Sequence, residues 1–284
     1  MPIIRKEKLH RSVRILVLLI GISSPFSALW ADACTAVQPQ GEGSEASPYQ
    51  LSTPAELIWF KTNGSSSHFA LTNHIDMSGC PWGGGRSAVF SGTFDGQGHV
   101  IDGLSMDAST QKVGFFQEIG NSGAVKNLGL TNVDLVSRFN PLTPDQDGYI
   151  GGLAAYSRGS IESSFVTGRV EAIYSGASNG DAMYVGGLVG WGIFTSTTTD
   201  SWFSGVAVGG SYVGGLFGRL DNLLEQSFAV GTVEGTYAGG LVGRTTSAGS
   251  QEQIINSYSN VAVDGSYAGG LVGRMELTAI LRSQ

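Results

Sequence analysis

The feature that most constrains the fold of this 284-residue chain is the segment Tyr-Xaa-Gly-Gly-Leu, which occurs five times in its second half. The copies begin at Tyr149, Tyr184, Tyr212, Tyr237 and Tyr267, and the second glycines of their pairs are Gly152, Gly187, Gly215, Gly240 and Gly270. A spacing of roughly 25 to 35 residues indicates that one structural unit is stacked repeatedly. The sequence therefore predicts a repeat architecture.

The segments around these glycines have the character of strands. They are short and rich in Val, Tyr, Phe and Ser, and none keeps the apolar period of a helix over several turns. We expect each coil to contribute two or three short parallel strands, with neighbouring coils roughly 4.8 Å apart. The predicted fold class is all-β, a right-handed parallel β-helix (β-solenoid), whose hand follows the usual preference of parallel crossovers.

Equivalent residues of successive coils should stack in files along such a helix. A leucine file is assigned to the core at Leu153, Leu188, Leu216, Leu241 and Leu271. The tyrosine file has two interpretations, a half-buried structural stack or an aromatic stripe that faces a ligand. A further aromatic position, in the second half of the coil, is predicted to hold Phe165, Phe203, Phe228 and Tyr258.

An arginine file follows the glycine pairs at Arg219, Arg244 and Arg274, and Trp191 takes the same place in an earlier copy. Arginines one layer apart would repel unless they splay or lie beside acids. The candidate acids are Asp221, Glu234, Asp264 and Glu276. Anion binding by the arginines is the alternative. Trp191 is predicted at a solvent-facing corner, where its side chain either packs that corner or stacks on a sugar ring. Trp191 and the three arginines are therefore the candidate binding residues.

The copies differ in length mainly after Gly-Gly-Leu, which predicts loops on one edge of the stack. These loops are Ala172 to Met183, Gly192 to Thr199 and Thr245 to Gln253. Loops held by a rigid scaffold are the usual place for binding in such folds. The loops are therefore the expected contact points for a partner.

The N-terminus has the pattern of an export signal. Five basic residues precede an apolar run from Ile15 to Ile22, which is too short to span a membrane. We predict a signal peptide over residues 1–33, cleaved after Ala31 or Ala33, and no transmembrane span in the mature chain. Cys34 and Cys80 are the only cysteines, and an even pair in an exported chain predicts a disulfide.

Residues 34–82 are predicted to form an N-terminal cap segment and residues 83–284 the repeats. Thr53-Pro54-Ala55-Glu56 has the pattern of a capped helix start, so a short helix over about 54–61 is expected to cover the end of the stack. The other end stops within a copy, which predicts an incomplete last coil. We expect a truncated chain that lacks a C-terminal module, or a partner that covers the last layer.

Charge and residue spacing exclude several functions. The formal net charge of −7, more negative once the basic leader is removed, disfavours nucleic-acid binding. Asp95 and Asp102 flank a glycine-rich turn with His99 and could form the carboxylate pair of a polysaccharide-cleaving enzyme, yet Asp-Gly is also a common turn dipeptide. The histidines lack metal-ligand spacing, and no nucleophile motif is present. We therefore predict no catalytic residue, no metal and no cofactor.

The Gly-Gly-Leu segments, with Ile254 to Tyr258 (IINSY) between two of them, resemble the GLUG repeats of large bacterial surface proteins. Gly92 to Leu104 (GTFDGQGHVIDGL) looks like the opening coil that such regions often carry. The resemblance covers about residues 48–284 and is specific for the repeat but not for an activity. It implies an exported β-helical protein of adhesin type.

Three functions remain open from the sequence. The preferred one is an exported cell-surface or secreted scaffold that mediates adhesion, or binds surface glycans or host or matrix proteins, through its edge loops. The second is a polysaccharide-acting β-helix enzyme, a lyase or glycoside hydrolase, that uses Asp95, Asp102 or the acids of the loop 140–147. The third is a structural spacer of a larger surface protein.

Overall fold

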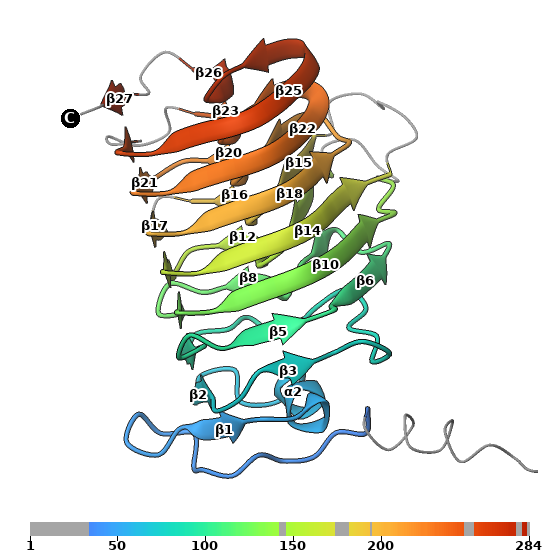
Figure 1. Ribbon diagram of the computed structural model, residues 1–284, viewed down its shortest axis with the longest axis vertical. Helices are drawn as coiled ribbons and strands as arrows, with labels where there is room; N and C mark the ends of the chain where they lie inside the picture. The colour runs from blue at the N-terminus through green and yellow to red at the C-terminus, as the bar shows by residue number, and fades with distance from the viewer. Residues whose placement is uncertain are drawn as a thin grey trace, which may run out of the picture.

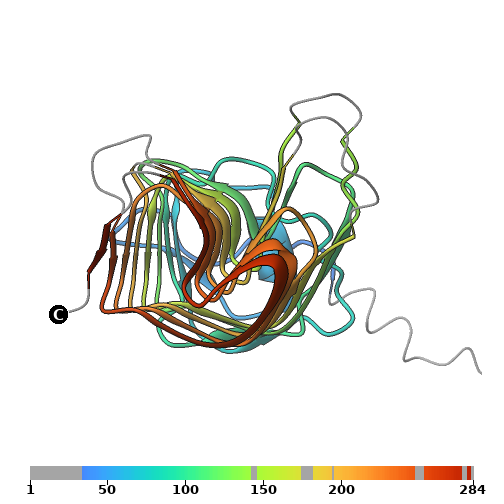
Figure 2. The same ribbon diagram turned by 90° about the horizontal axis from the view of Figure 1, so that it is seen from above.

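A computed structural model describes residues 34–141, 146–173, 182–193, 195–246, 253–276 and 280–282, the last three and residue 253 for their backbone alone. The described part of the protein is nearly all-β, with 54% of the described residues in strands and 3% in helix. Figure 1 shows the strands of successive coils stacked from the N-terminal end to the C-terminal end, and Figure 2 shows them superposed when seen along the stack. The predicted signal peptide, residues 1–33, lies outside the described residues.

The described strands form three sheets in which the named strands pair in parallel. The first sheet contains, in spatial order, β1 (Tyr49–Leu51), β2 (His68–Leu71), β4 (Thr93–Asp95), β9 (Ala124–Lys126), β13 (Ser160–Glu162), β17 (Thr197–Thr199), β21 (Leu223–Glu225), β24 (Gln253–Ile255) and β27 (Ile280–Arg282). Because each strand pairs with the equivalent strand of the next coil, the order along the sheet follows the order along the chain.

The second sheet is the largest, and long curved strands form most of it. Its strands are β3 (Ile75–Asp76), β5 (Val100–Asp102), β6 (Ser105–Ala108), β7 (Lys112–Val113), β10 (Gly129–Ser137), β11 (Gly148–Gly151), β14 (Phe165–Ala172), β15 (Met183–Gly186), β18 (Trp202–Val208), β19 (Tyr212–Gly214), β22 (Phe228–Gly239) and β25 (Tyr258–Gly269). The third sheet contains β8 (Phe116–Ile119), β12 (Ala154–Ser157), β16 (Val189–Gly192), β20 (Phe217–Leu220), β23 (Val242–Thr245) and β26 (Val272–Met275).

The core lies between the three sheets and contains the predicted leucine file. Leu153, Leu188, Leu216 and Leu241 are fully buried, and Leu271 packs against them while partly exposed. The tyrosines of the repeat are in register from coil to coil, as Tyr184 pairs with Tyr212 and Tyr212 with Tyr237. The repeated segment therefore fixes the register of the stack, as predicted.

The glycine pairs allow the coils to approach closely. A Cβ placed on Gly152 would lie 2.7 Å from the carbonyl oxygen of Gly187 in the next coil, and a Cβ on Gly187, Gly215 or Gly240 would also come within 3.0 Å of the next glycine carbonyl oxygen. None of these four has a left-handed φ. These glycines are therefore required for the close approach of the layers and not for a left-handed backbone.

The short N-terminal helix agrees with the prediction. Helix α2 (Pro54–Phe60) begins with a capping box, in which Thr53 Oγ1 accepts from the Glu56 N–H and the Glu56 carboxylate accepts from the Thr53 N–H. It lies at the N-terminal end of the stack (Figure 1), where Phe60 packs edge-on against Phe69 and Phe94 of the first coils. The helix thus covers apolar surface that the first coil would otherwise expose.

The predicted disulfide joins Cys34 to Cys80, with a Cα–Cα distance of 5.5 Å. It ties the beginning of the described chain to the segment after β3. Loop closure in the unfolded chain makes such a bond stabilising by about 4 kcal/mol. The cap is therefore held covalently as well as by packing.

One predicted alignment is wrong by a residue. The aromatic file in the second sheet is Phe165, Trp202, Phe228 and Tyr258, whereas Phe203 pairs with Val166 and Ala229 and is buried. The cause is one extra residue at Gly209 and Gly210, both with positive φ, between β18 and β19. Since side chains alternate across a strand, a shift of one residue exchanges the outer and the core face.

Gly187→Ala tests the close approach of the coils. The added methyl group meets the Gly215 carbonyl oxygen and the Phe203 ring, so we expect the free energy of unfolding to fall by at least about 2 kcal/mol. Gly270→Ala is the matched control, because its Cβ would have no described neighbour within 4 Å. Urea denaturation measures both variants, and equal stabilities would contradict the role assigned to the glycine pairs.

Candidate functional site

The predicted binding residues lie together in one structure, which we name the Tyr–Arg ladder. Its tyrosines are Tyr149, Tyr184, Tyr212, Tyr237 and Tyr267 of the second sheet, and its other members are Trp191, Arg219, Arg244 and Arg274 of the third sheet. Neighbouring tyrosine rings stack with centroids 4.6 to 5.8 Å apart. Because each glycine pair lies between its tyrosine and its arginine, the two files face each other across that turn.

The arginines cross the layers of the stack. The Arg244 guanidinium lies 5.1 Å from the Tyr212 ring and donates to the Tyr184 hydroxyl at 3.1 Å. Arg274 repeats this arrangement one coil higher, with a bond of 2.9 Å to the Tyr212 hydroxyl. Each of these arginines therefore links its own coil to the two coils below it by cation–π contact and hydrogen bonding.

Carboxylates compensate the charge of the arginine file. Asp221 is buried and accepts from Arg219, from the Trp191 indole N–H at 2.8 Å and from the Thr246 hydroxyl at 2.7 Å. Glu276 pairs with Arg244 at 2.7 Å. Of the four acids predicted for this role, these two perform it.

The other two predicted acids lie elsewhere. Glu234 and Asp264 occupy equivalent register positions on the neighbouring long strands β22 and β25. They line a separate surface hollow with Thr236 and Ser266. Their separation from the arginines along the sequence did not indicate that they lie apart from the arginine file, because it is the path of the long curved strands that places them elsewhere.

Trp191 is in register with Arg219, as predicted, but it is partly buried rather than facing solvent. Its ring lies 5.1 Å from Tyr156 and 5.3 Å from Tyr149, and the Arg219 guanidinium covers it at 4.1 Å. The polar groups of the ladder thus bond mainly to one another. Its geometry serves to hold coils together, and ligand binding by these residues stays a prediction.

Asp221→Ala tests this network. The change leaves the largely buried Arg219 guanidinium, the Trp191 N–H and the Thr246 hydroxyl without their shared acceptor, so we expect a loss of about 3 kcal/mol in unfolding free energy. Asp107→Ala is the control, because its partner Arg138 and Asp107 itself are each more than half exposed, and such pairs add little. Equal effects in chemical denaturation would contradict a structural role for Asp221.

The ladder also predicts a response to alkaline pH. Burial raises the pKa of Tyr149, with a further contribution from the charge of Asp147, and burial likewise raises the pKa of Tyr184. A raised pKa in the folded state means that stability is fully present below the unfolded pKa of about 10 and is lost as the pH rises above it.

In an alkaline titration we therefore expect part of the tyrosinate absorbance to appear only above pH ~10, together with a loss of near-UV circular dichroism. In Tyr184→Phe, which retains the ring but not the ionisable hydroxyl, the late absorbance should decrease. Titration of every tyrosine near pH 10 with an intact fold would contradict the burial of these phenols.

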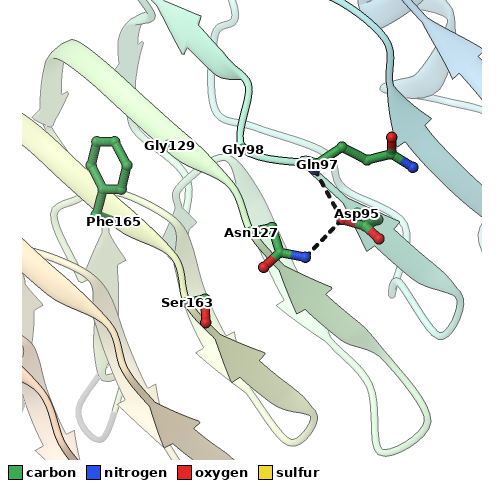
Figure 3. Close-up of a pocket in the computed structure, with 7 residues that line it drawn as sticks. All are labelled: Asp95, Gln97, Gly98, Asn127, Gly129, Ser163 and Phe165. Atoms are coloured by element: carbon green, nitrogen blue, oxygen red, sulfur yellow. Dashed lines mark hydrogen bonds between the residues drawn. The ribbon is translucent and has the colours of Figure 1, made fainter.

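A second candidate site lies on the outside of the stack, at the corner between the first and second sheets. We name it the corner hollow. It has a volume of about 540 Å³ and is lined by Asp95, Gln97, Gly98, Asn127, Gly129, Ser163 and Phe165 (Figure 3). Three coils contribute to it, because Asp95, Asn127 and Ser163 come at the ends of the successive strands β4, β9 and β13.

Left-handed residues shape this corner. Gln97, Asn127 and Ser163 have φ values of 51°, 53° and 47°, a conformation that short polar side chains tolerate best. Asp95 Oδ1 accepts from the Gln97 N–H at 2.9 Å and from Asn127 Nδ2 at 3.0 Å. This fixes the amide of Asn127, whose carbonyl oxygen lies on the side of Ser163 and Phe165 in Figure 3.

The hollow offers free polar groups beside an aromatic ring. Within the described part of the chain, the side-chain amide of Gln97, Asn127 Oδ1 and Ser163 Oγ have no hydrogen-bond partner. Phe165 stacks on Trp202 with a centroid distance of 4.2 Å, and its ring lies over Gly129, where a Cβ would clash. The arrangement can accept and donate hydrogen bonds to a ligand that also contacts the edge of the ring.

The candidate catalytic acids do not form a pair in this hollow. Asp102 bonds to Thr131 Oγ1 and Asn132 Nδ2 and does not line it. Asp95 is the only carboxylate among its lining residues. Burial alone would raise the pKa of Asp95, but hydrogen bonds from Asn127 and Gln97 and the charge of Lys126 outweigh it and lower this pKa. Asp95 is therefore ionised at neutral pH and positions Asn127.

Sequence reasoning missed Gln97, Asn127 and Ser163. The sequence holds part of a signal, since a serine recurs after Ser163, Asp200, Gln226 and Asn256, but the left-handed φ that these four residues share is seen only in the structure. The buried serines after these residues form their own file, in which Ser164 N–H donates to Ser201 Oγ at 3.2 Å and Ser201 N–H to Ser227 Oγ at 3.1 Å. The serine hydroxyls thus accept from backbone N–H groups at the corner, where the hydrogen bonding between the backbones of neighbouring strands is interrupted.

No group of three or more His, Cys, Asp or Glu side chains among the described residues could hold a metal ion. No described helix has the length and apolar character needed to cross a bilayer. Residues 174–181, 194 and 247–252 of the predicted edge loops lie outside the described residues, as do residues 142–145 of the acidic loop.

Comparison with known proteins gives distant relatives. No family model matches the chain. Halomucin of Haloquadratum walsbyi is 31% identical over 175 residues, 57% of this chain. An Evansella cellulosilytica protein, provisionally named a Gly-rich membrane protein, is 33% identical over 101 residues, 32% of this chain. The chain spans only 2% and 12% of the lengths of these two relatives.

One solved structure is similar in fold. It is the crystal structure of a Bacteroides ovatus protein provisionally named an immunoglobulin A1 protease, with a TM-score of 0.64. The similarity covers 86% of this chain and 79% of the other at 21% sequence identity. At this identity the likeness concerns the fold alone.

Proposed function

We propose that this chain is an exported, extracellular scaffold, wound as a right-handed parallel β-helix, which binds an extracellular glycan in the corner hollow. The observation that carries the proposal is the oriented Asn127 amide, held by Asp95, beside the unpaired Ser163 hydroxyl and the Phe165 ring. Fixed amide and hydroxyl groups next to an aromatic surface suit a ligand with many hydroxyl groups and apolar C–H faces. A sugar has this chemistry.

Several observations support export. The Cys34–Cys80 disulfide is typical of proteins that leave the cytosol. The basic and apolar pattern of residues 1–33 is that of a signal peptide. One relative carries the name of a membrane protein. A surface or secreted location accounts for all three.

The assignment of the repeats to the GLUG type belongs to the same proposal. Its support is the exact recurrence of Tyr and Gly-Gly at equivalent places, with Tyr149, Tyr184 and Tyr212 in register. The right-handed wind rests on the general preference of parallel crossovers. The stacked coils then act as a rigid support, which is also what a structural spacer would require.

Binding is favoured over catalysis by the state of Asp95. Glycoside hydrolysis requires two carboxyl groups about 5 to 10 Å apart, one of which is protonated. Asp95 accepts from Gln97, Asn127 and Lys126, and its pKa is lowered, so it cannot act as the general acid. We propose that the protein is not an enzyme at this site.

The test compares two asparagines in the same backbone conformation. Asn127→Ala removes an amide of the corner hollow, and Asn256→Ala removes an exposed left-handed asparagine of another coil. We expect the protein to bind at least one member of a panel of cellulose, xylan, mannan and chitin oligomers, and Asn127→Ala to weaken this binding by about tenfold, the equivalent of one hydrogen bond to a fixed group. Asn256→Ala should bind as the unmodified protein does.

Phe165→Ala should weaken the same interaction, while Phe228→Ala, farther along the aromatic file, should not. Calorimetry measures binding, and circular dichroism verifies that each variant is folded. A panel without any bound member would disprove the proposal. Equal loss in both asparagine variants would place the ligand away from the corner hollow.

A further inference from the structure

A second hollow adjoins the corner hollow. It has a volume of about 240 Å³, and its lining includes Glu45, His68, Thr93 and Lys126. Both hollows include Asp95 and Gln97 in their linings. The two are therefore continuous across these two residues.

The register of the strands gives the direction of this continuity. His68 of β2 pairs with Thr93 of β4, and Asp95 of β4 pairs with Lys126 of β9. The corner hollow begins at Asp95 and continues to Ser163 after β13. A ligand that occupies both hollows thus passes from the first coils toward later ones, at an advance of roughly 4.8 Å per coil.

The charges differ between the two parts. Asp95 is the only ionisable side chain in the lining of the corner hollow, whereas the second hollow adds Glu45, His68 and Lys126. Lys126 lies 3.4 Å from Asp95 and is 43% exposed in its side chain. Acids and bases are mixed there, so donors and acceptors alternate and the local charges largely cancel. Such a surface favours an uncharged polyhydroxyl unit over a free anion or cation.

We infer that the two hollows are adjacent subsites for an uncharged oligosaccharide of at least two units. One unit lies against Phe165 and Asn127, and its neighbour lies between His68 and Lys126, with the linkage above Asp95 and Gln97. This inference rests on the proposed function, since it assigns the length and charge of the glycan bound there. It adds a second subsite, formed by the residues of the first coils.

The test is calorimetry of the full chain with β-1,4-linked oligomers of glucose and of N-acetylglucosamine, each with one, two or four units. We expect two-unit ligands to bind at least about tenfold more tightly than one-unit ligands. Glu45→Ala combined with His68→Ala should abolish this gain and leave the one-unit affinity unchanged. Glu162→Ala is the matched control, because Glu162 is an exposed acid on the same sheet that lines neither hollow.

The outcomes separate the two proposals. If neither oligomer series binds at any length, the second subsite is overturned, while binding of the xylan and mannan oligomers still tests the proposed function separately. If ligands bind with an affinity that is independent of length, or if the double variant retains the gain, the second subsite is overturned while glycan binding stands. Loss of the gain in Glu162→Ala as well would attribute the effect to the charge of the face rather than to the hollow.

Discussion

The rest of the structure depends on how closely successive coils approach one another at the glycine pairs. Each backbone there lies against the carbonyl oxygen of the next glycine, so no side chain fits between. This contact brings the strands of the second and third sheets into register and stacks the leucines in the core. It also brings side chains of the same type, at equivalent positions of neighbouring coils, into direct contact. This is favourable for tyrosine and unfavourable for arginine.

The Tyr–Arg ladder resolves that conflict. The arginines lie over the tyrosine rings of the coil below, and Arg244 and Arg274 donate to hydroxyls two coils away, while Asp221 and Glu276 supply negative charge. A file of like charges thereby becomes a set of bonds between layers. The corner hollow has the opposite character, because its side chains leave donors and acceptors without partners. The ladder that stabilises the stack and the hollow proposed for recognition are therefore different surfaces of the same stack.

Many elements of the fold could be predicted because they follow from local chemistry or from recurrence. The capping box of Thr53 and Glu56 is contained in four residues, and the disulfide follows from there being two cysteines. The position of Trp202 could not be predicted, because one extra residue at Gly209 and Gly210 shifts the count and exchanges the faces of the strand. The residues of the corner hollow presented a similar difficulty, since Asn127 and Ser163 are conspicuous only when their left-handed φ values are known.

The amino-acid pattern alone was sufficient to predict stacked parallel strands, a leucine core and a tyrosine file, because a repeat carries its register in its own spacing. The pattern did not decide which of the candidate acids pairs with the arginines. Glu234 and Glu276 are equally plausible partners for the arginines by composition, and only the path of the curved strands brings one to Arg244 and takes the other away. The corner hollow likewise exists because Asp95, Asn127 and Ser163, about thirty residues apart, meet where three coils turn.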